Sequence, residues 1–208
     1  LGDVYKRQIV TSNIKKNGIL FVMRIEDREV AAYLDVYRCI LEKMICKMTS
    51  AGLTDSISYN FIVQMIPHHK AAIEMSENVL RYIENTDLKR IAEGIIVEQT
   101  RSIENMCDIV EGCRRVTNCK QDLCRYQCEM REIMQVMFCR MRQAKETDSI
   151  ACNFMWEMIP HHEGAVEMSK TTLSNCICPC LSPILKNIIM SQERGIRQMK
   201  ELQYRLCC

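Results

Sequence analysis

An apolar stripe with helical spacing runs through residues 61–79. Its members recur every three or four residues, so they share one face of an α-helix. They are Phe61, Met65, His68, Ala72, Met75 and Val79. The same spacing returns later in the chain as Phe154, Met158, His161, Ala165, Met168 and Thr172. The pattern predicts two long amphipathic helices whose apolar face carries a histidine.

The two stripes belong to a repeated segment. Residues 60–76 and 153–169 are identical at eleven of seventeen positions, with a constant offset of 93 residues. Further identities at the same offset occur on both sides, which indicates a duplicated unit without net insertion or deletion. Most positions that differ, such as Gln64 and Glu157, are polar and lie off the stripe.

Each unit is predicted to contain three helices. They span about 26–51, 56–84 and 87–114 in the first unit, and about 120–146, 149–174 and 182–206 in the second. A Thr-Asp-Ser stretch supplies an N-cap for each second helix. Scarce glycine (7) and proline (4) also favour helices over sheets. The sequence therefore predicts an all-α fold of two homologous three-helix repeats, packed as a pseudo-two-fold bundle.

Three segments are predicted along the chain. Residues 26–115 form the first repeat unit, and residues 116–208 form the second. Residues 1–25 are interpreted as an artefactual or disordered N-terminus, because 1–8 look like a translated sequencing-adapter scar. The native start would then be Met23, or a signal sequence would have been lost upstream. As the sequence stands, it has no targeting segment and no membrane-spanning run, which indicates a cytoplasmic location with export as the alternative.

Charge narrows the range of partners. The chain has 28 lysines and arginines against 26 aspartates and glutamates. A net charge near zero gives no reason to expect a nucleic acid or an anionic membrane as a partner. A metal ion is the expected partner, and self-association into a homo-oligomer stays open.

The chain also contains 14 cysteines and 15 methionines. We favour reduced thiols over a disulfide framework, because a Cys176-x-Cys178-x-Cys180 run and adjacent Cys207 and Cys208 are typical of soft-metal or redox chemistry. The run is a second, independent candidate for a soft metal, with Cys207 and Cys208 as additional ligands. Other cysteines lie within helical patterns and are interpreted in part as small buried hydrophobes: Cys39, Cys46, Cys124, Cys128 and Cys139.

Thioether and imidazole groups gather in each unit. Together they suit a soft ion, and monovalent copper is the natural candidate. Zinc has little use for thioether, and the Glu-x-x-His motif of helical di-iron sites is absent. The candidate ligands on the second helices are Met65, His68, His69 and Met75, with Met158, His161, His162 and Met168. Supporting thioethers on the first helices are Met44, Met48, Met137 and Met141.

A structural interpretation competes with the metal site. Methionine at helical spacing commonly fills a core. Buried imidazoles also need polar partners, which Gln99 and Gln192 could supply. A His-His pair with methionine on both sides, present twice, favours the metal. No cysteine recurs near the histidines, so nucleophilic catalysis has little support.

A longer motif is similar to a known family. Phe-x3-Met-Ile-Pro-His-His-x2-Ala-x2-Met-Ser, followed by Gln-x3-Ile-x2-Met, resembles the bacterial family catalogued as domain of unknown function 305. The two copies cover residues 33–108 and 126–201. The resemblance implies a ferritin-like helical bundle and a role in copper binding or resistance. Members are often exported, which the sequence itself does not indicate here.

By this resemblance, the candidate histidines and methionines of the second helices take the family's motif positions. On the third helices, the matched residues are Gln99, Met106, Gln192 and Met199. The family commonly has an acidic residue before the isoleucine of the last motif, where this chain has Ser102 and Gly195. We therefore expect a non-enzymatic protein that binds Cu(I) for buffering or tolerance. The alternatives are a metal-free helical scaffold or interaction protein and, with less support, a metal-dependent oxidoreductase.

Overall fold

The computed structural model describes residues 15–16, 19–20 and 25–207. Its helices are α1 (Ile25–Thr49), α2 (Ile57–Leu80), α3 (Thr86–Arg114), α4 (Lys120–Arg142), α5 (Ile150–Leu173) and α6 (Ser182–Leu206). Ahead of them, β1 (Lys15–Lys16) and β2 (Ile19–Leu20) form a short antiparallel pair. The other positions of the predicted N-terminal segment, including 1–8 and Met23, lie outside the described residues.

Six helices in the described part of the chain confirm the predicted all-α bundle. Ser56 and Ser149 cap α2 and α5, accepting hydrogen bonds from backbone N–H groups three residues ahead at 3.2 and 3.3 Å. α2 ends at Leu80, four residues before its predicted end. The chain turns there, because the backbone N–H groups of residues 81 and 82 bond back to the carbonyls of residues 78 and 79. Asn85 then caps α3.

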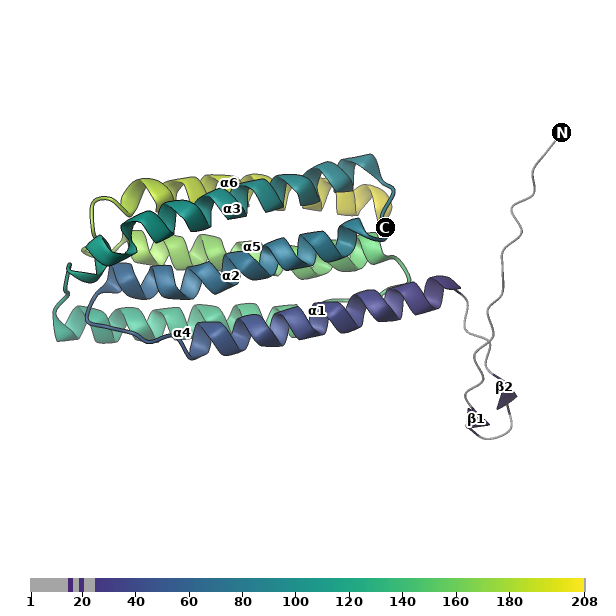
Figure 1. The fold of residues 1–208 in the computed structure, drawn as a ribbon, viewed down its shortest axis with the longest axis horizontal. Coiled ribbons are helices and arrows are strands. Elements are labelled where there is room, and N and C mark those ends of the chain that lie inside the picture. The colour runs from purple at the N-terminus through teal and green to yellow at the C-terminus, as the bar shows by residue number, and fades with distance from the viewer. Residues whose placement is uncertain (1–14, 17–18, 21–24, 208) are drawn as a thin grey trace.

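The helices form three layers (Figure 1). α3 and α6 make one outer layer, α2 and α5 the middle layer, and α1 and α4 the other outer layer. The two halves of the chain meet through α2 against α5 and α3 against α6. The middle helices are covered on both sides, so polar groups on them are removed from water unless a cleft reaches them.

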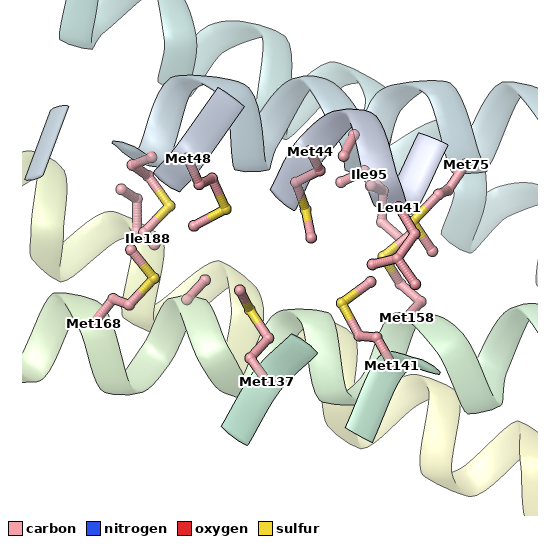
Figure 2. Packing of buried hydrophobic residues seen from close by; sticks show 14 of the residues in the cluster. Leu41, Met44, Met48, Met75, Ile95, Met137, Met141, Met158, Met168 and Ile188 are labelled. Carbon is pink, nitrogen blue, oxygen red and sulfur yellow. The ribbon is translucent and has the colours of Figure 1, made fainter. Parts of the chain in front are cut away.

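Methionine supplies much of the core between these layers. Figure 2 shows Met44 and Met48 of α1 and Met137 and Met141 of α4 with their side chains directed into the interior. Each of these side chains is at most 2% exposed. A flexible, polarisable thioether fills irregular gaps at low strain, so this packing is stable in itself and does not require a metal.

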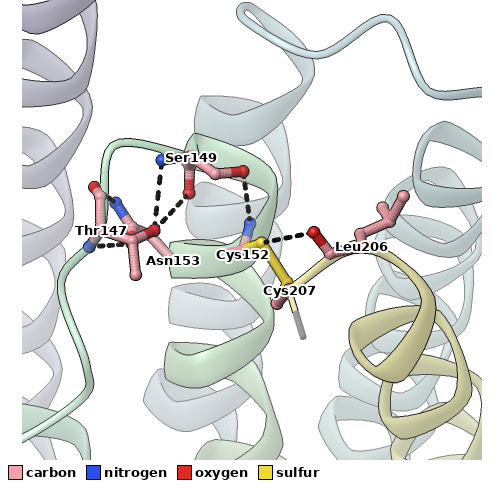
Figure 3. The surroundings of a disulfide bond; sticks show 6 residues. All are labelled: Thr147, Ser149, Cys152, Asn153, Leu206 and Cys207. Atoms are coloured by element: carbon pink, nitrogen blue, oxygen red, sulfur yellow. Dashed lines mark hydrogen bonds between the residues drawn. A yellow bond between two sulfur atoms is a disulfide. The ribbon is translucent and has the colours of Figure 1, made fainter.

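A disulfide joins the C-terminal end of α6 to the beginning of α5. Cys152 and Cys207 are bonded through their sulfurs, with their Cα atoms 5.8 Å apart (Figure 3). The expectation of reduced thiols is therefore wrong for Cys207, which cannot serve as a ligand for the cysteine run. Cys208 lies outside the described residues.

The cysteines within the helical patterns are not buried. All five that were interpreted in part as small buried hydrophobes are exposed free thiols. They lie on α1 and α4, which turn one face to the middle layer and the other to solvent. Spacing alone did not tell which face each cysteine takes. In the part of the chain that the structure describes, no helix is both long and apolar enough to cross a membrane.

Candidate metal centre

The four histidines form one cluster at the contact between α2 and α5. The rings of His68 and His161 stack, with centroids 3.6 Å apart and planes inclined by 26°. His69 lies 5.9 Å from His68, and His162 lies 5.9 Å from His161. None of the four is more than 2% exposed. The two pairs belong to separate sequence units, yet the fold brings them together between the two halves.

Reciprocal hydrogen bonds fix the tautomers of the two central rings. His68 Nε2 lies 3.2 Å from the carbonyl oxygen of His161, and His161 Nε2 lies 3.1 Å from that of His68. A carbonyl oxygen only accepts, so each Nε2 carries the proton and donates it. In a neutral imidazole the Nδ1 atom then holds a free lone pair. One nitrogen donating to a carbonyl while the other stays basic is the arrangement of a metal-binding histidine.

The outer histidines contact α3 and α6 at equivalent positions of the two units. His69 Nε2 lies 3.0 Å from the Ser102 hydroxyl. In the second unit that position is Gly195, and a Cβ added there would lie 3.1 Å from His162 Nε2. The serine therefore gives one outer histidine a hydrogen-bond partner, whereas the glycine lets the ring of the other approach the helix backbone more closely than a side chain would allow.

A cleft of about 250 Å³ between α3 and α6 reaches the cluster at His162. Gln99 and Gln192 line it, and the ion pair of Glu98 with Arg194 lies on its wall. The cleft connects an otherwise buried site with the surface. An ion could therefore approach the imidazoles without unfolding of the middle layer.

Several acceptor atoms around the cluster are buried without a partner. They include Nδ1 of all four histidines and Oε1 of both Gln99 and Gln192. The glutamines were considered as structural partners for the imidazoles, but in the described residues neither is hydrogen-bonded to a histidine. A buried polar atom without a partner costs free energy. Within the described residues no three of the four imidazoles place nitrogens within 4.8 Å of one another, so a cation here would be held by at most two imidazoles at a time.

Burial keeps the imidazoles neutral. It lowers the pKa of His161 to about 4, and burial together with the charge of His161 lowers the pKa of His69 to about 3. The pKa values of His68 and His162 also lie well below the ordinary value, first because of burial and then because of the neighbouring imidazoles. At neutral pH no proton therefore competes with a metal ion for their lone pairs.

All eight candidate methionines are buried, each at most 2% exposed. Their positions along the helices do not all suit one ion. Met65 lies one turn before the His68–His69 pair, whereas Met75 lies ten residues after Met65, about 15 Å along a helix with a 1.5 Å rise. Met65 and Met75 cannot bind the same ion. The same holds for Met158 and Met168, so the compact ligand set is smaller than the predicted one.

The Met137 side chain packs directly against the backbone of α5. A Cβ added to Gly164 would lie 2.2 Å from the Met137 sulfur. Gly164 is one turn after His161, so this thioether rests on the backbone next to the cluster. Met44 lies beside Pro67 and Ala71 in the other half.

Sequence reasoning missed a buried carboxyl group near the cluster. Glu157 is 1% exposed, and the Tyr33 hydroxyl donates to its Oε2 at 2.5 Å. Burial raises the pKa of Glu157 to about 8. The equivalent Gln64 is also buried and donates to the carbonyl of Met48 at 3.3 Å. Neither position lies on the apolar stripe, and only the packing of the outer helices against this face reveals their burial.

Comparison with known proteins identifies the family of the chain. A family model described as domain of unknown function (DUF305) matches residues 58–203. The chain belongs to the DUF305 family. The resemblance predicted from the motif is thereby confirmed. No curated protein matches the sequence significantly.

Solved structures of similar fold include the protein CopM. Silver-bound CopM has 27% identity and a TM-score of 0.56, and the match covers 74% of this DUF305 chain and all of CopM (100%). The Cu(I)-bound form has 27% identity and a TM-score of 0.54, with 76% and 100% covered. A DUF305 fragment from Deinococcus radiodurans shares the fold at 21% identity and a TM-score of 0.53, with 72% and 97% covered.

Proposed function

We propose that this DUF305 protein binds Cu(I), or a chemically similar soft ion, at the histidine cluster and catalyses no reaction there. The observation that carries the proposal is the set of buried Nδ1 atoms without partners. In His68 and His161 the opposite ring nitrogen is already committed to a backbone carbonyl. CopM structures with silver, Cu(I) and Cu(II) support the same chemistry.

The charge of the cluster favours a monovalent ion. Its imidazoles are neutral, and no carboxylate contributes to their pKa shifts. Burying a divalent cation among neutral ligands would leave two charges uncompensated, at a much larger desolvation cost than one. Imidazole and thioether are also preferred ligands of Cu(I). Met65 and Met158 are the thioethers on the turn before each histidine pair.

The test is an anaerobic titration of the full chain with Cu(I) in competition with a cuprous-selective chelator. We expect the double variant His68→Gln/His161→Gln to lose the tight copper assigned to the histidine cluster, which the wild type and the control retain. An amide can still donate to the facing carbonyl, so the fold has a better chance of surviving than with alanine. Met190→Leu is the matched control, because Met190 is exposed at 59% and lies away from the cluster.

Thermal unfolding gives an independent measurement. A ligand that binds only the native state must stabilise it, by about 2.7 kcal/mol at a hundred times the dissociation constant. Copper should therefore raise the unfolding temperature of the wild type and of Met190→Leu by more than that of the histidine variant. Equal copper binding by all three proteins would overturn the assignment to the histidines, and no shift for any of them would favour the metal-free scaffold.

A further inference from the structure

Three thiols meet at one end of the bundle, away from the histidines. Cys113 lies in the last turn of α3, and Cys178 and Cys180 lie in the connection between α5 and α6. Their sulfurs all lie within 4.8 Å of one another. The sulfurs of Cys113 and Cys180 are 3.7 Å apart. Cys113 and Cys178 are buried, whereas Cys180 is exposed and gives the group access to solvent.

Hydrogen bonds hold the backbone on both sides of this thiol cluster. The N–H of Cys178 donates to the Ser58 hydroxyl at 2.8 Å. The Ser56 hydroxyl donates to the carbonyl of Cys113 at 2.8 Å. The Asn118 amide donates to the carbonyl of residue 176 at 2.7 Å, which ties the α5–α6 connection to the α3–α4 linker. The three thiols are thus held together by segments from four parts of the chain.

We propose that Cys113, Cys178 and Cys180 form a second metal site that binds one Cu(I) through three thiolates. Three sulfurs around one ion, at bonds of about 2.3 Å as in zinc–thiolate sites, lie about 4.0 Å apart. The observed spacing needs little adjustment to reach that value. Cu(I) is soft and accepts three thiolate ligands, whereas structural zinc takes four protein ligands. Within the described residues, no fourth histidine, cysteine, aspartate or glutamate joins the group.

The start of the next helix places a favourable field for negative charge at this end of the bundle. α6 begins just after this loop, and a helix N-terminus stabilises negative charge. On binding Cu(I), each of the three thiols releases its proton to solvent and no electron is transferred.

The internal repeat supplies a comparison within the same molecule. At the 93-residue offset, the three cysteines correspond to Leu206, Asn85 and Asp87. None of these is a soft ligand, so the equivalent positions at the other end of the bundle carry no such group. The chain would therefore hold one thiolate-bound copper in addition to any at the histidine cluster, and the two sites can be separated by mutation.

The experiment is an anaerobic Cu(I) titration of the reduced full chain against a cuprous chelator, with ultraviolet absorption of the thiolate-to-copper charge transfer as the readout. Cys113→Ser should lose the tight thiolate-bound equivalent. Cys176→Ser is the matched control, because this cysteine lies in the same loop, is exposed and is outside the group. It should retain the absorption of the wild type.

The histidine variant separates this site from the proposed function. His68→Gln/His161→Gln should keep the full charge-transfer band, even where it loses the copper assigned to the histidines. Unchanged copper binding and absorption in Cys113→Ser would overturn the thiolate site. So would a Cys113–Cys180 disulfide in protein purified without oxygen, or zinc that stays bound when one equivalent of Cu(I) is added.

Discussion

At the two ends of the bundle, equivalent helix ends are held together by different interactions. At one end the Arg114 guanidinium lies over the Tyr59 ring, 5.2 Å from its centroid. At the 93-residue offset these residues become Cys207 and Cys152, which form the disulfide. The same pair of helix ends is therefore held by a weak cation–π contact in one half and by a covalent bond in the other.

The centre of the molecule differs from both ends. His68 and His161 occupy equivalent positions and contact each other, each through the other's carbonyl. A substitution at one of these histidines would therefore also disturb the hydrogen bond made by the other. The two ends do not meet, so one end could change without the other. The comparison suggests that chemistry common to both units stays at the centre, while chemistry found only once, such as the thiol cluster, develops at an end.

The largest predicted effect on stability comes from removing the Cys152–Cys207 disulfide. Replacing both Cys152 and Cys207 by serine should lower the free energy of unfolding by about 2–4 kcal/mol, because the open chain regains conformational entropy when unfolded. Chemical denaturation under non-reducing conditions measures the difference. Adding a reductant should lower wild-type stability toward that of the variant. A wild type insensitive to reductant would show that this end does not depend on the bond.

The second prediction concerns two equivalent buried positions, which hold an acid in one unit (Glu157) and an amide in the other (Gln64). Each residue is replaced by its counterpart. Because the folded pKa of Glu157 is raised to about 8, the native state holds a proton that the unfolded state releases above its ordinary pKa of about 4.5. Stability therefore falls as pH rises through this window, by up to about 1.4 kcal/mol per pH unit. Glu157→Gln should remove that dependence and stabilise the protein by about 1–3 kcal/mol near pH 8.

Gln64→Glu is the reciprocal change and should introduce the same pH dependence into the first unit. Urea denaturation of the wild type and both variants, at about pH 5 and about pH 8, separates the effects. Parallel pH profiles for the wild type and Glu157→Gln would mean that this carboxyl group is ionised in the folded protein.

Much of the fold could be predicted from the sequence, because helix periodicity and capping are local properties. The Thr-Asp-Ser stretches specify where α2 and α5 begin, and the apolar stripe specifies which face of each is buried. The histidines were identified because their spacing places them on or beside that stripe. Their convergence into one cluster was not predicted, because it depends on how α2 crosses α5.

Contacts between distant segments account for what the sequence did not reveal. Cys178 and Cys180 drew attention as a short-range run, but Cys113 lies 65 residues earlier and has no local signal. Cys152 likewise gives no sign that it pairs with Cys207. The burial of Glu157 depends on Tyr33 in α1. In each case the partner comes from another helix, and no pattern within one helix can specify it.

A smaller effect is expected from filling the space beside α5. In Gly164→Ala the new methyl group would displace the Met137 side chain, whose sulfur would otherwise lie 2.2 Å away. Overpacking of this kind costs about 1–3 kcal/mol, partly offset by alanine's helix propensity of about 1 kcal/mol over glycine. Thermal denaturation should give a net loss near the lower end of that range. Ala71→Gly at the equivalent site should lose about 1 kcal/mol of helix propensity. A gain of that size in Gly164→Ala would contradict the Met137 contact.

The smallest predicted effect concerns the non-covalent end. Arg114→Gln should lower the free energy of unfolding by about 0.5–1 kcal/mol, since a cation–π contact at an exposed site contributes about that much. Arg115→Gln controls for the loss of charge next to the helix end. A double-mutant cycle with Tyr59→Leu isolates the pair, because the coupling energy vanishes if the two side chains act independently. A coupling energy close to the free energy of unfolding lost on removing the disulfide would mean that the two ends are equally restrained. The covalent bond would then have replaced a contact that was already sufficient to hold the helices.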